Sequence, residues 1–507
     1  MTRTTIAAGV FAPSVLVLLG LAVGHGALEQ DVHPAASTSA AITPSAAPPA
    51  GETHHAAEIH RGFLYGRITT VGGDTYEGRL RWGGYQEAFW GDYFNGSKDE
   101  NPWGAHVPLE RLPKERRSLE IFGFEIAHRE RHIDLGRKFM ARFGDIARIE
   151  ARGLRGVRVT LKSGTVFDLD RWDASDFDDG VRVWDGRRGV VDVKSLQILT
   201  IDLLPTPPLV GAVPDRLHGT VRTRQGDFTG FVQWDREECV GSDELDGNTA
   251  DGKLSLRFDT IRSIARHSPD SSLVTLVDGR EIALSDINDV GRGNRGMYVD
   301  DRRYGRVRIP WDAFERVDFS LGGSGPAHGD FPPGHPLTGS VTTRDGGRLT
   351  GRLVYDLDES ETTETLDAPA QGVDYTILFG LIASIVLPGP EERDAQGARV
   401  TLHSGEELQL EPTGDLGERN AGLLIFVDGD QRAEYLPWTD VERINFDRPP
   451  EMYPPLVSAG PRTDPGPRNR VSDTESRSRT TASGGRDPRP LSLPGRSRAG
   501  SATGGSR

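Results

Sequence analysis

One apolar frame constrains this chain more than any other feature, because it occurs three times. The stretch IPWDAFERVDF at 309–319 returns as LPWTDVERINF at 436–446, and a diverged copy, VDVKSLQILTI, lies at 191–201. A related frame, Phe-x-x-Ile-x-x-Ile, ends three further stretches, at 143–149, 258–264 and 379–385. Internal repetition of this kind indicates an array of similar structural units.

The spacing within these frames predicts a short turn followed by a strand. Apolar residues at steps of three lie on one side of a single 3₁₀ turn. The alternation that follows has the period of a β-strand. Each of the six stretches is therefore expected to end as strand, 3₁₀ turn and final strand.

Two kinds of frame alternate along the chain. The first opens at 64–82, 217–235 and 337–356 with alternating apolar residues on both sides of a glycine turn, which predicts a β-hairpin. Glycines inside the second strand of each hairpin, at 78, 230 and 351, predict a bulge or a sharp bend. The second frame opens with VTLKSG, VTLVDG and VTLHSG at 159–164, 274–279 and 400–405.

The order of hairpin, hairpin, 3₁₀ turn and final strand resembles that of SH3-like and Sm-like small β-barrels. This resemblance implies an all-β fold of three tandem repeats, each made of two such barrels. A barrel of about 50 residues buries a small fraction of its surface, so paired barrels are expected to stabilise one another. A six-bladed β-propeller is the alternative, because six similar units can also close a ring.

Composition and repetition together predict the division of the chain. The expected segments are a signal peptide or N-terminal anchor at 1–27, an Ala/Pro/Ser-rich linker at 28–57, repeat 1 at 58–205, repeat 2 at 213–320, repeat 3 at 335–448 and a disordered basic tail at 449–507. Repeat 1 carries an insertion at 97–138 that the other two repeats lack. Loops of this length are uncommon unless they are functional or flexible.

The N-terminus predicts export. Arg3 precedes an apolar run to Val23, and small residues follow it, which is typical of a secretory signal peptide. The run also approaches the length of a membrane span, so an uncleaved anchor is the alternative and the one expected route to a membrane. In either case the body is extracytoplasmic, in the periplasm, at the cell surface or secreted. Cys239 is the single cysteine, so no disulfide can form within the chain.

The charge distribution disfavours nucleic acid as a partner. The 507 residues carry a net charge of −15, while the segment 449–507 has ten Arg against five acidic residues. The rest of the chain is therefore more acidic still, and an acidic body repels phosphate backbones. The expected partners are envelope proteins or polysaccharide.

One repeated aromatic position is the candidate ligand site. Trp82, Trp234 and Tyr355 occupy it, and Asp235 and Asp356 follow the last two. An aromatic ring beside a carboxylate suits the stacking and hydrogen bonding of a sugar. The alternative is that each aromatic side chain packs in a core, as aromatic residues in strands usually do.

Acidic clusters raise the question of calcium, which prefers carboxylate oxygens. They are Asp173, Asp176, Asp178 and Asp179; Asp243, Glu244, Asp246 and Asp251; and Asp286, Asp289, Asp300 and Asp301. None has the spacing of an EF-hand loop. We therefore expect no cofactor and no metal site, with calcium as the alternative. His128 and His132 lie four residues apart but lack a third ligand.

The sequence contains no catalytic motif of defined spacing, such as G-x-S-x-G or H-E-x-x-H. We therefore expect a non-catalytic repeat protein that acts as an envelope scaffold or as a binding and adhesion surface. A carbohydrate-binding or peptidoglycan-binding protein is the first alternative. A glycoside-acting hydrolase is the second, because its carboxylates need only meet in space.

Overall fold

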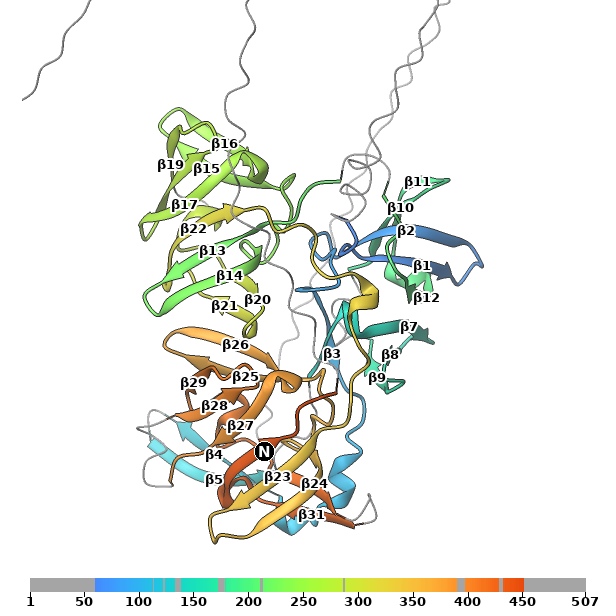
Figure 1. Cartoon of the computed structure of the whole chain (residues 1–507), viewed down its shortest axis with the longest axis vertical. Helices are drawn as coiled ribbons and strands as arrows, with labels where there is room; N and C mark the ends of the chain where they lie inside the picture. The colour runs from blue at the N-terminus through green and yellow to red at the C-terminus, as the bar shows by residue number, and fades with distance from the viewer. Residues whose placement is uncertain are drawn as a thin grey trace, which may run out of the picture.

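The described part of the chain folds as antiparallel β-sheets joined by short 3₁₀ turns and loops (Figure 1). The computed structural model describes residues 60–450, apart from 113, 122–123, 133–137, 172–176, 178, 210–212, 286–287, 390–396 and 428–431. Within these residues the regular elements are strands and short 3₁₀ turns, which confirms the all-β prediction. The expected signal segment, the linker up to 57 and the tail beyond 450 lie outside the described residues.

The first repeat contributes one eight-stranded sheet and two separate two-stranded sheets. Its strands, apart from two in the insertion, are β1 (Tyr65–Thr70), β2 (Thr75–Trp82), β3 (Tyr93–Ser97), β6 (Lys138–Arg142), β7 (Ile146–Arg152), β8 (Gly156–Leu161), β9 (Val166–Asp170), β10 (Val181–Asp185), β11 (Gly189–Val193) and β12 (Ile198–Leu203). The sheet order is β11-β10-β2-β1-β12-β7-β8-β9, and β3 pairs with β6.

The second repeat forms ten strands of a twelve-stranded sheet. They are β13 (His218–Thr223), β14 (Gly226–Gln233), β15 (Glu244–Thr249), β16 (Gly252–Arg257), β17 (Ile261–Ser268), β18 (Ser271–Leu276), β19 (Glu281–Ser285), β20 (Met297–Asp301), β21 (Gly305–Ile309) and β22 (Phe314–Ser320). Their order is β16-β15-β19-β18-β17-β22-β13-β14-β20-β21.

The third repeat supplies the last two strands of that sheet and a further eight-stranded sheet. Its strands are β23 (Thr338–Thr343), β24 (Arg348–Val354), β25 (Thr365–Ala370), β26 (Val373–Leu378), β27 (Ile382–Val386), β28 (Ala398–Leu402), β29 (Glu407–Leu410), β30 (Leu423–Val427), β31 (Arg432–Leu436) and β32 (Val441–Phe446). The hairpin β25–β26 pairs with β21, which joins repeats 2 and 3 edge to edge.

The two frames of each repeat exchange strands, which the sequence did not predict. In repeat 1 the final strand β12 pairs with β1 of the first frame and with β7, and β10 pairs with β2. Conversely, the β3–β6 pair lies beside β9 through a bridge between Lys98 and Leu169. The two frames of a repeat are therefore not self-contained units. The described strands also form open sheets rather than closed barrels.

The exchange of strands between frames explains the three glycines inside the hairpin strands. A Cβ atom on Gly78, Gly230 or Gly351 would lie 2.0–2.1 Å from a backbone oxygen of the neighbouring strand, β10, β20 or β30. Only glycine permits so close an approach between two backbones. These glycines are therefore explained by the close approach of another strand and not by the predicted bulge. At each of them a strand of one frame packs against a strand of the other frame.

The predicted 3₁₀ turns are present in five of the six frames. They are η3 (Phe143–Asp145), η4 (Ser195–Gln197), η5 (Phe258–Thr260), η8 (Phe379–Leu381) and η10 (Trp438–Asp440). The sixth, at 311–313, is a hydrogen-bonded turn in which Ala313 N donates to Pro310 O at 3.0 Å. The aromatic residues that open the turns, such as Phe143, are buried in the cores.

The three repeats pack against one another as one body. In Figure 1 repeats 2 and 3 are stacked along the long axis and repeat 1 lies beside them. A continuous apolar core runs through repeats 2 and 3, and a second core fills repeat 1. Phe231 of repeat 2 and Phe331 of the following connection both belong to the core of repeat 1. The repeats are thus not independently packed domains.

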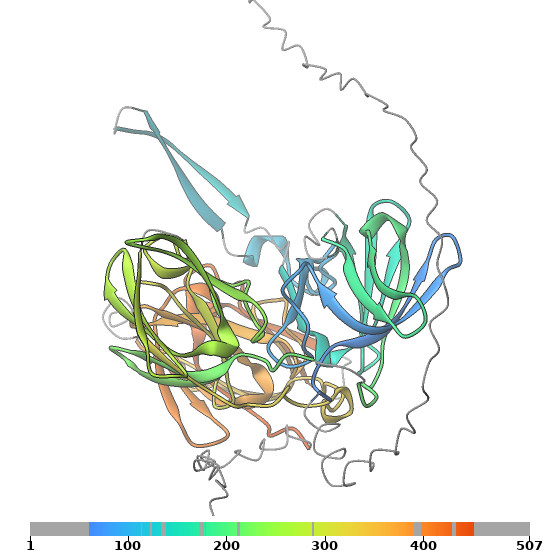
Figure 2. The ribbon, with the colours of Figure 1, turned by 90° about the horizontal axis from the view of Figure 1, so that it is seen from above.

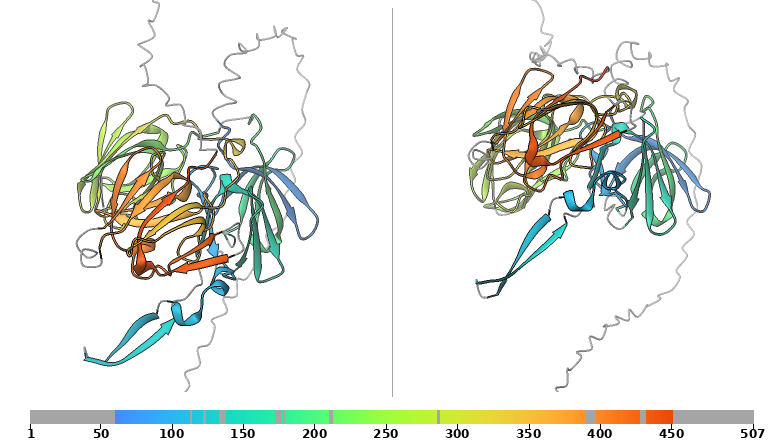
Figure 3. Two further views of the ribbon diagram at one scale, coloured as in Figure 1. Left: turned by 60° about the horizontal axis from the view of Figure 1, so that its bottom comes forward. Right: turned by 90° about the horizontal axis from the view of Figure 1, so that it is seen from below.

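The insertion in repeat 1 reaches repeat 3. Its 3₁₀ turns η1 (Trp103–His106) and η2 (Leu109–Arg111) are followed by a ribbon of β4 (Lys114–Ile121) and β5 (Phe124–His132). This ribbon projects away from the body, as Figures 2 and 3 show from different sides. Val107 and Leu112 pack into an apolar cluster on repeat 3.

Candidate functional site

The repeated aromatic position predicted as a ligand site lies in the cores. The side chains of Trp82, Trp234 and Tyr355 have 1%, 0% and 0% of their surface exposed. The indole N–H of Trp234 donates to Asp289 O at 2.9 Å, and the hydroxyl of Tyr355 donates to Asp415 O at 2.8 Å. These polar groups are therefore satisfied internally, and the geometry favours the packing interpretation.

Asp235 and Asp356 occupy tight turns that follow these aromatic residues. Asp235 and Arg236 have φ values of 44° and 64°, and Asp356 and Leu357 have 51° and 54°. Positive φ is rare outside glycine, although Asp tolerates it better than most residues. Each carboxylate then accepts a hydrogen bond from a backbone N–H across the repeat, from Arg295 N to Asp235 and from Ala421 N to Asp356. Both carboxylates anchor turns, one in repeat 2 and the other in repeat 3.

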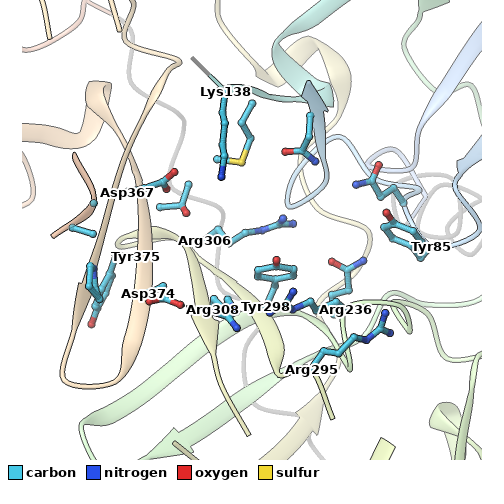
Figure 4. Close-up of a pocket in the computed structure, with 18 of the residues that line it drawn as sticks. Tyr85, Lys138, Arg236, Arg295, Tyr298, Arg306, Arg308, Asp367, Asp374 and Tyr375 are labelled. Carbon is cyan, nitrogen blue, oxygen red and sulfur yellow. Dashed lines mark hydrogen bonds and ion pairs between the residues drawn. The ribbon is translucent and has the colours of Figure 1, made fainter. Parts of the chain in front are cut away.

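The turn of repeat 2 opens onto a pocket that all three repeats share (Figure 4). Its volume is about 740 Å³, within the usual range for small-molecule sites. The lining residues are Tyr85, Gln86, Asn95, Lys138 and Met140 from repeat 1; Gln233, Arg236, Glu237, Arg295, Tyr298, Arg306 and Arg308 from repeat 2; and Asp367, Ala368, Pro369, Asp374, Tyr375, Thr376 and Gly414 from repeat 3. None of them is His, Cys or Ser.

Arg306 forms the floor of this pocket. Its Nε lies 3.2 Å from Asp300 Oδ1, and its Nη2 donates to the carbonyl of Gly91 in repeat 1. The guanidinium also stacks on Tyr93 and Tyr298, with ring-centroid distances of 4.4 and 4.3 Å. Burial raises the pKa of Asp300 to about 6, although the charge of Arg306 opposes that shift. Arg306 thus holds repeats 1 and 2 together beneath the pocket.

Two more arginines of the lining are paired with carboxylates. Arg295 contacts Glu237 at 2.9 Å as well as Asp235 at 3.0 Å. Arg308 contacts Asp374 of repeat 3 at 2.6 Å. These pairs fix the walls of the pocket. They also occupy two of its three carboxylates.

The third carboxylate is Asp367, on β25. Burial raises its pKa, while a hydrogen bond from Thr376 and the charge of Lys138 oppose the rise. Its backbone N–H donates to Asp415. A single buried acid of this kind holds a proton more readily than a surface Asp does.

Four buried polar atoms of the lining have no hydrogen-bond partner within the protein. They are Gln86 Oε1, Gln233 Nε2, Arg236 Nε and Arg308 Nε. Gln86 and Gln233 are each only 5% exposed. Buried polar groups are nearly always paired, so these four atoms are exceptions, and each is itself shielded from solvent rather than open to the cavity.

The acidic clusters considered for calcium are engaged in other contacts. Arg303 contacts Asp301 at 2.7 Å, Arg81 contacts Asp243 at 3.1 Å, and Lys253 contacts Asp246 at 2.7 Å. Within the described part of the chain no group of three or more His, Cys, Asp or Glu is arranged to hold a metal ion. Asp173, Asp176, Asp178 and Asp286 lie outside that part. The side chains of His128 and His132 are outside it as well.

Sequence reasoning missed the pocket because its residues come from separate repeats and share no motif. One local signal was available: the WDREE turn at 234–238 has Arg236 where the first repeat has Gly84. A large cation at a position of positive φ is costly and therefore informative about function.

Comparison with known proteins adds no relative. No protein-family model matches the chain, and no curated protein or solved structure shows significant similarity to it. Among the described residues no helix is long and apolar enough to cross a bilayer. The site must therefore be judged on its own chemistry.

Proposed function

We propose that this chain is an exported, non-catalytic binding and scaffold protein of the cell envelope. One observation carries the proposal: the three repeats are locked together around a polar pocket to which each contributes side chains. The proposal of export depends on the N-terminal sequence alone. Binding sites commonly lie at the junctions of domains, because concave surfaces arise there.

The interface between repeats 1 and 3 supports a rigid scaffold. Lys98 Nζ lies 2.7 Å from Asp358 and 2.9 Å from Glu364, with its side chain only 10% exposed. Asn101 donates to the carbonyl of Leu357 at 2.8 Å. Buried pairs of this kind fix orientation, because breaking one leaves an uncompensated charge.

The interface between repeats 1 and 2 contains a second buried ionic cluster. Glu87, whose side chain is 1% exposed, contacts Arg79 at 2.7 Å and Arg81 at 3.3 Å. Arg81 continues to Asp243 of repeat 2. Cys239 of repeat 2 donates its thiol to Tyr85 O at 2.8 Å. A pocket held by such contacts is preorganised, and preorganisation reduces the entropic cost of binding.

We further infer that each repeat is a pair of open, SH3-like half-barrels that have exchanged strands. The order β11-β10-β2-β1-β12 joins the first hairpin of one frame to the second hairpin and final strand of the other. The order β16-β15-β19-β18-β17 in repeat 2 does the same with the frames reversed. A propeller blade is built from consecutive strands, so this exchange favours paired half-barrels over six blades.

The hydrolase hypothesis has less support. Glu237 and Asp374 in the pocket are both paired with arginines. A glycoside hydrolase needs two carboxylates placed on either side of the scissile bond. A binding role needs no such pair.

The proposal is tested by co-sedimentation of the full mature chain with purified cell-wall sacculi and with insoluble polysaccharides. We expect the protein to pellet with at least one of these polymers and to be released by soluble fragments of the same polymer. A protein that stays in the supernatant with every polymer contradicts polymer binding. In-cell cross-linking would then have to find protein partners for the scaffold role to stand.

A further inference from the structure

We propose that the pocket between the three repeats binds an acidic saccharide, a polyhydroxylated ligand that carries a carboxylate. This inference rests on the binding function proposed above and names the ligand class.

Cationic side chains outnumber carboxylates in the lining of the pocket. The cations are Lys138, Arg236, Arg295, Arg306 and Arg308, and the carboxylates are Glu237, Asp367 and Asp374. This excess of positive charge suits an anionic ligand.

Two cations of the lining are free to bind a ligand anion. Arg236 and Lys138 have no ion pair among the described residues, whereas Arg295, Arg306 and Arg308 each have at least one. The guanidinium of Arg236 lies over the ring of Tyr298, at 5.6 Å from its centroid. In Figure 4 Lys138 and Arg236 lie on either side of Arg306, and the pocket extends between them.

The size of the pocket favours a ligand larger than a bare oxyanion. Inorganic phosphate or sulfate would pair with the two cations but would fill little of a volume of about 740 Å³. Sugar hydroxyls both donate and accept, and a uronic acid adds the carboxylate that suits Arg and Lys. Tyr85 adds a partly exposed ring of the kind that lines sugar sites.

Arg236 can be replaced by a residue that suits the backbone conformation of its turn. Repeat 1 has Gly84 at the same place in the turn, with φ of 81°, and Arg236 has φ of 64°. Arg236→Gly therefore removes the guanidinium and fits the backbone of the turn. Lys138→Gln removes the second cation at the exposed start of β6. Arg224→Gln is the matched control, because Arg224 is 75% exposed in a hairpin turn away from the pocket lining.

The test is isothermal titration of the full mature chain with galacturonate oligomers of two to four sugars. Neutral gluco-oligosaccharides of the same length and inorganic phosphate are titrated in parallel. We expect the acidic oligomers to bind at least tenfold more tightly than either. Arg236→Gly and Lys138→Gln should each weaken that binding about tenfold or more, in line with the loss of a charge-assisted hydrogen bond. Arg224→Gln should leave it unchanged.

Three outcomes overturn the inference. Equal affinity for neutral and acidic oligomers would show that the cations do not select the ligand. Phosphate binding as tight as uronate binding would show that the pocket does not recognise a saccharide. Acidic binding that both pocket variants retain, with unchanged circular dichroism and melting temperature, places the site elsewhere. The proposed envelope function is tested independently of this inference. Uronate can bind the pocket even if the protein does not co-sediment with sacculi or polysaccharide, and the protein can co-sediment with them even if uronate does not bind the pocket.

Discussion

Glu238 is the residue whose replacement tests the electrostatic reasoning most directly. It lies in the turn after Trp234, at the position that Gln86 occupies in repeat 1, and its Oε2 has no hydrogen-bond partner. Burial, and next the charge of Asp289, raise its pKa from 4.5 to about 8. The folded chain therefore holds a proton at neutral pH that the unfolded chain releases.

The sign of the effect follows from proton linkage. An acid with a raised pKa in the folded state stabilises the fold while it is protonated, and this contribution is lost as pH rises from about 4.5 to about 8. At 1.36 kcal/mol per pKa unit the full shift corresponds to about 4.8 kcal/mol. Movement of the ionised side chain towards water lowers that limit, and we expect the wild type to lose about 2–4 kcal/mol across this interval.

The assay compares wild type and Glu238→Gln in urea at pH 5.0 and pH 8.5, with tryptophan fluorescence as the readout. Glutamine keeps the shape of a protonated glutamate, so the two proteins should have nearly equal midpoints at pH 5.0. At pH 8.5 the variant should be more stable by about 2–4 kcal/mol, because it has no charge to bury. The reciprocal change, Gln86→Glu, should add the same pH dependence to repeat 1. Parallel pH profiles for wild type and Glu238→Gln would refute the reasoning.

Three further predictions follow from buried groups. Lys98→Met should destabilise the fold by about 3–5 kcal/mol in urea unfolding, because Asp358 and Glu364 lose their shared cation; an effect below about 1 kcal/mol would mean that the pair is solvated. Trp234→Ala should lower the stability by about 3–5 kcal/mol in the same assay and leave uronate affinity within about twofold, since the side chain is core. The Cys239 thiol, whose pKa is raised by burial, should react with a disulfide reagent only after urea unfolds the chain; rapid labelling of the native protein would contradict its burial.

The local elements of this fold could be predicted because their signals are local. The step of three in Phe143-x-x-Ile146 specifies one 3₁₀ turn wherever the segment packs, and five such turns are present. The glycines at 78, 230 and 351 marked positions where a side chain cannot fit. The sequence could not show what approaches them, because a glycine signals a close contact without naming the neighbour.

The candidate site, too, could be predicted from the sequence only in its local features. The repeated aromatic position was correctly recognised as equivalent in the three repeats, and the structure places it in the cores. The pocket depends on Lys138, Arg236 and Asp367, which are far apart in the chain and belong to different repeats. No periodicity links them, so they could not be found by comparing one repeat with the next.

The sequence by itself determined the all-β class, the triplication and the turns, because each depends on side chains within a few residues of one another. The tertiary structure alone decided that β12 pairs with β1 and that the repeats surround a common pocket. A strand with one apolar face satisfies its hydrogen bonds equally well against any partner of matching pattern. Its partner is selected by the packing of the whole chain, in which buried charges such as Arg306 must find their counterions in other strands.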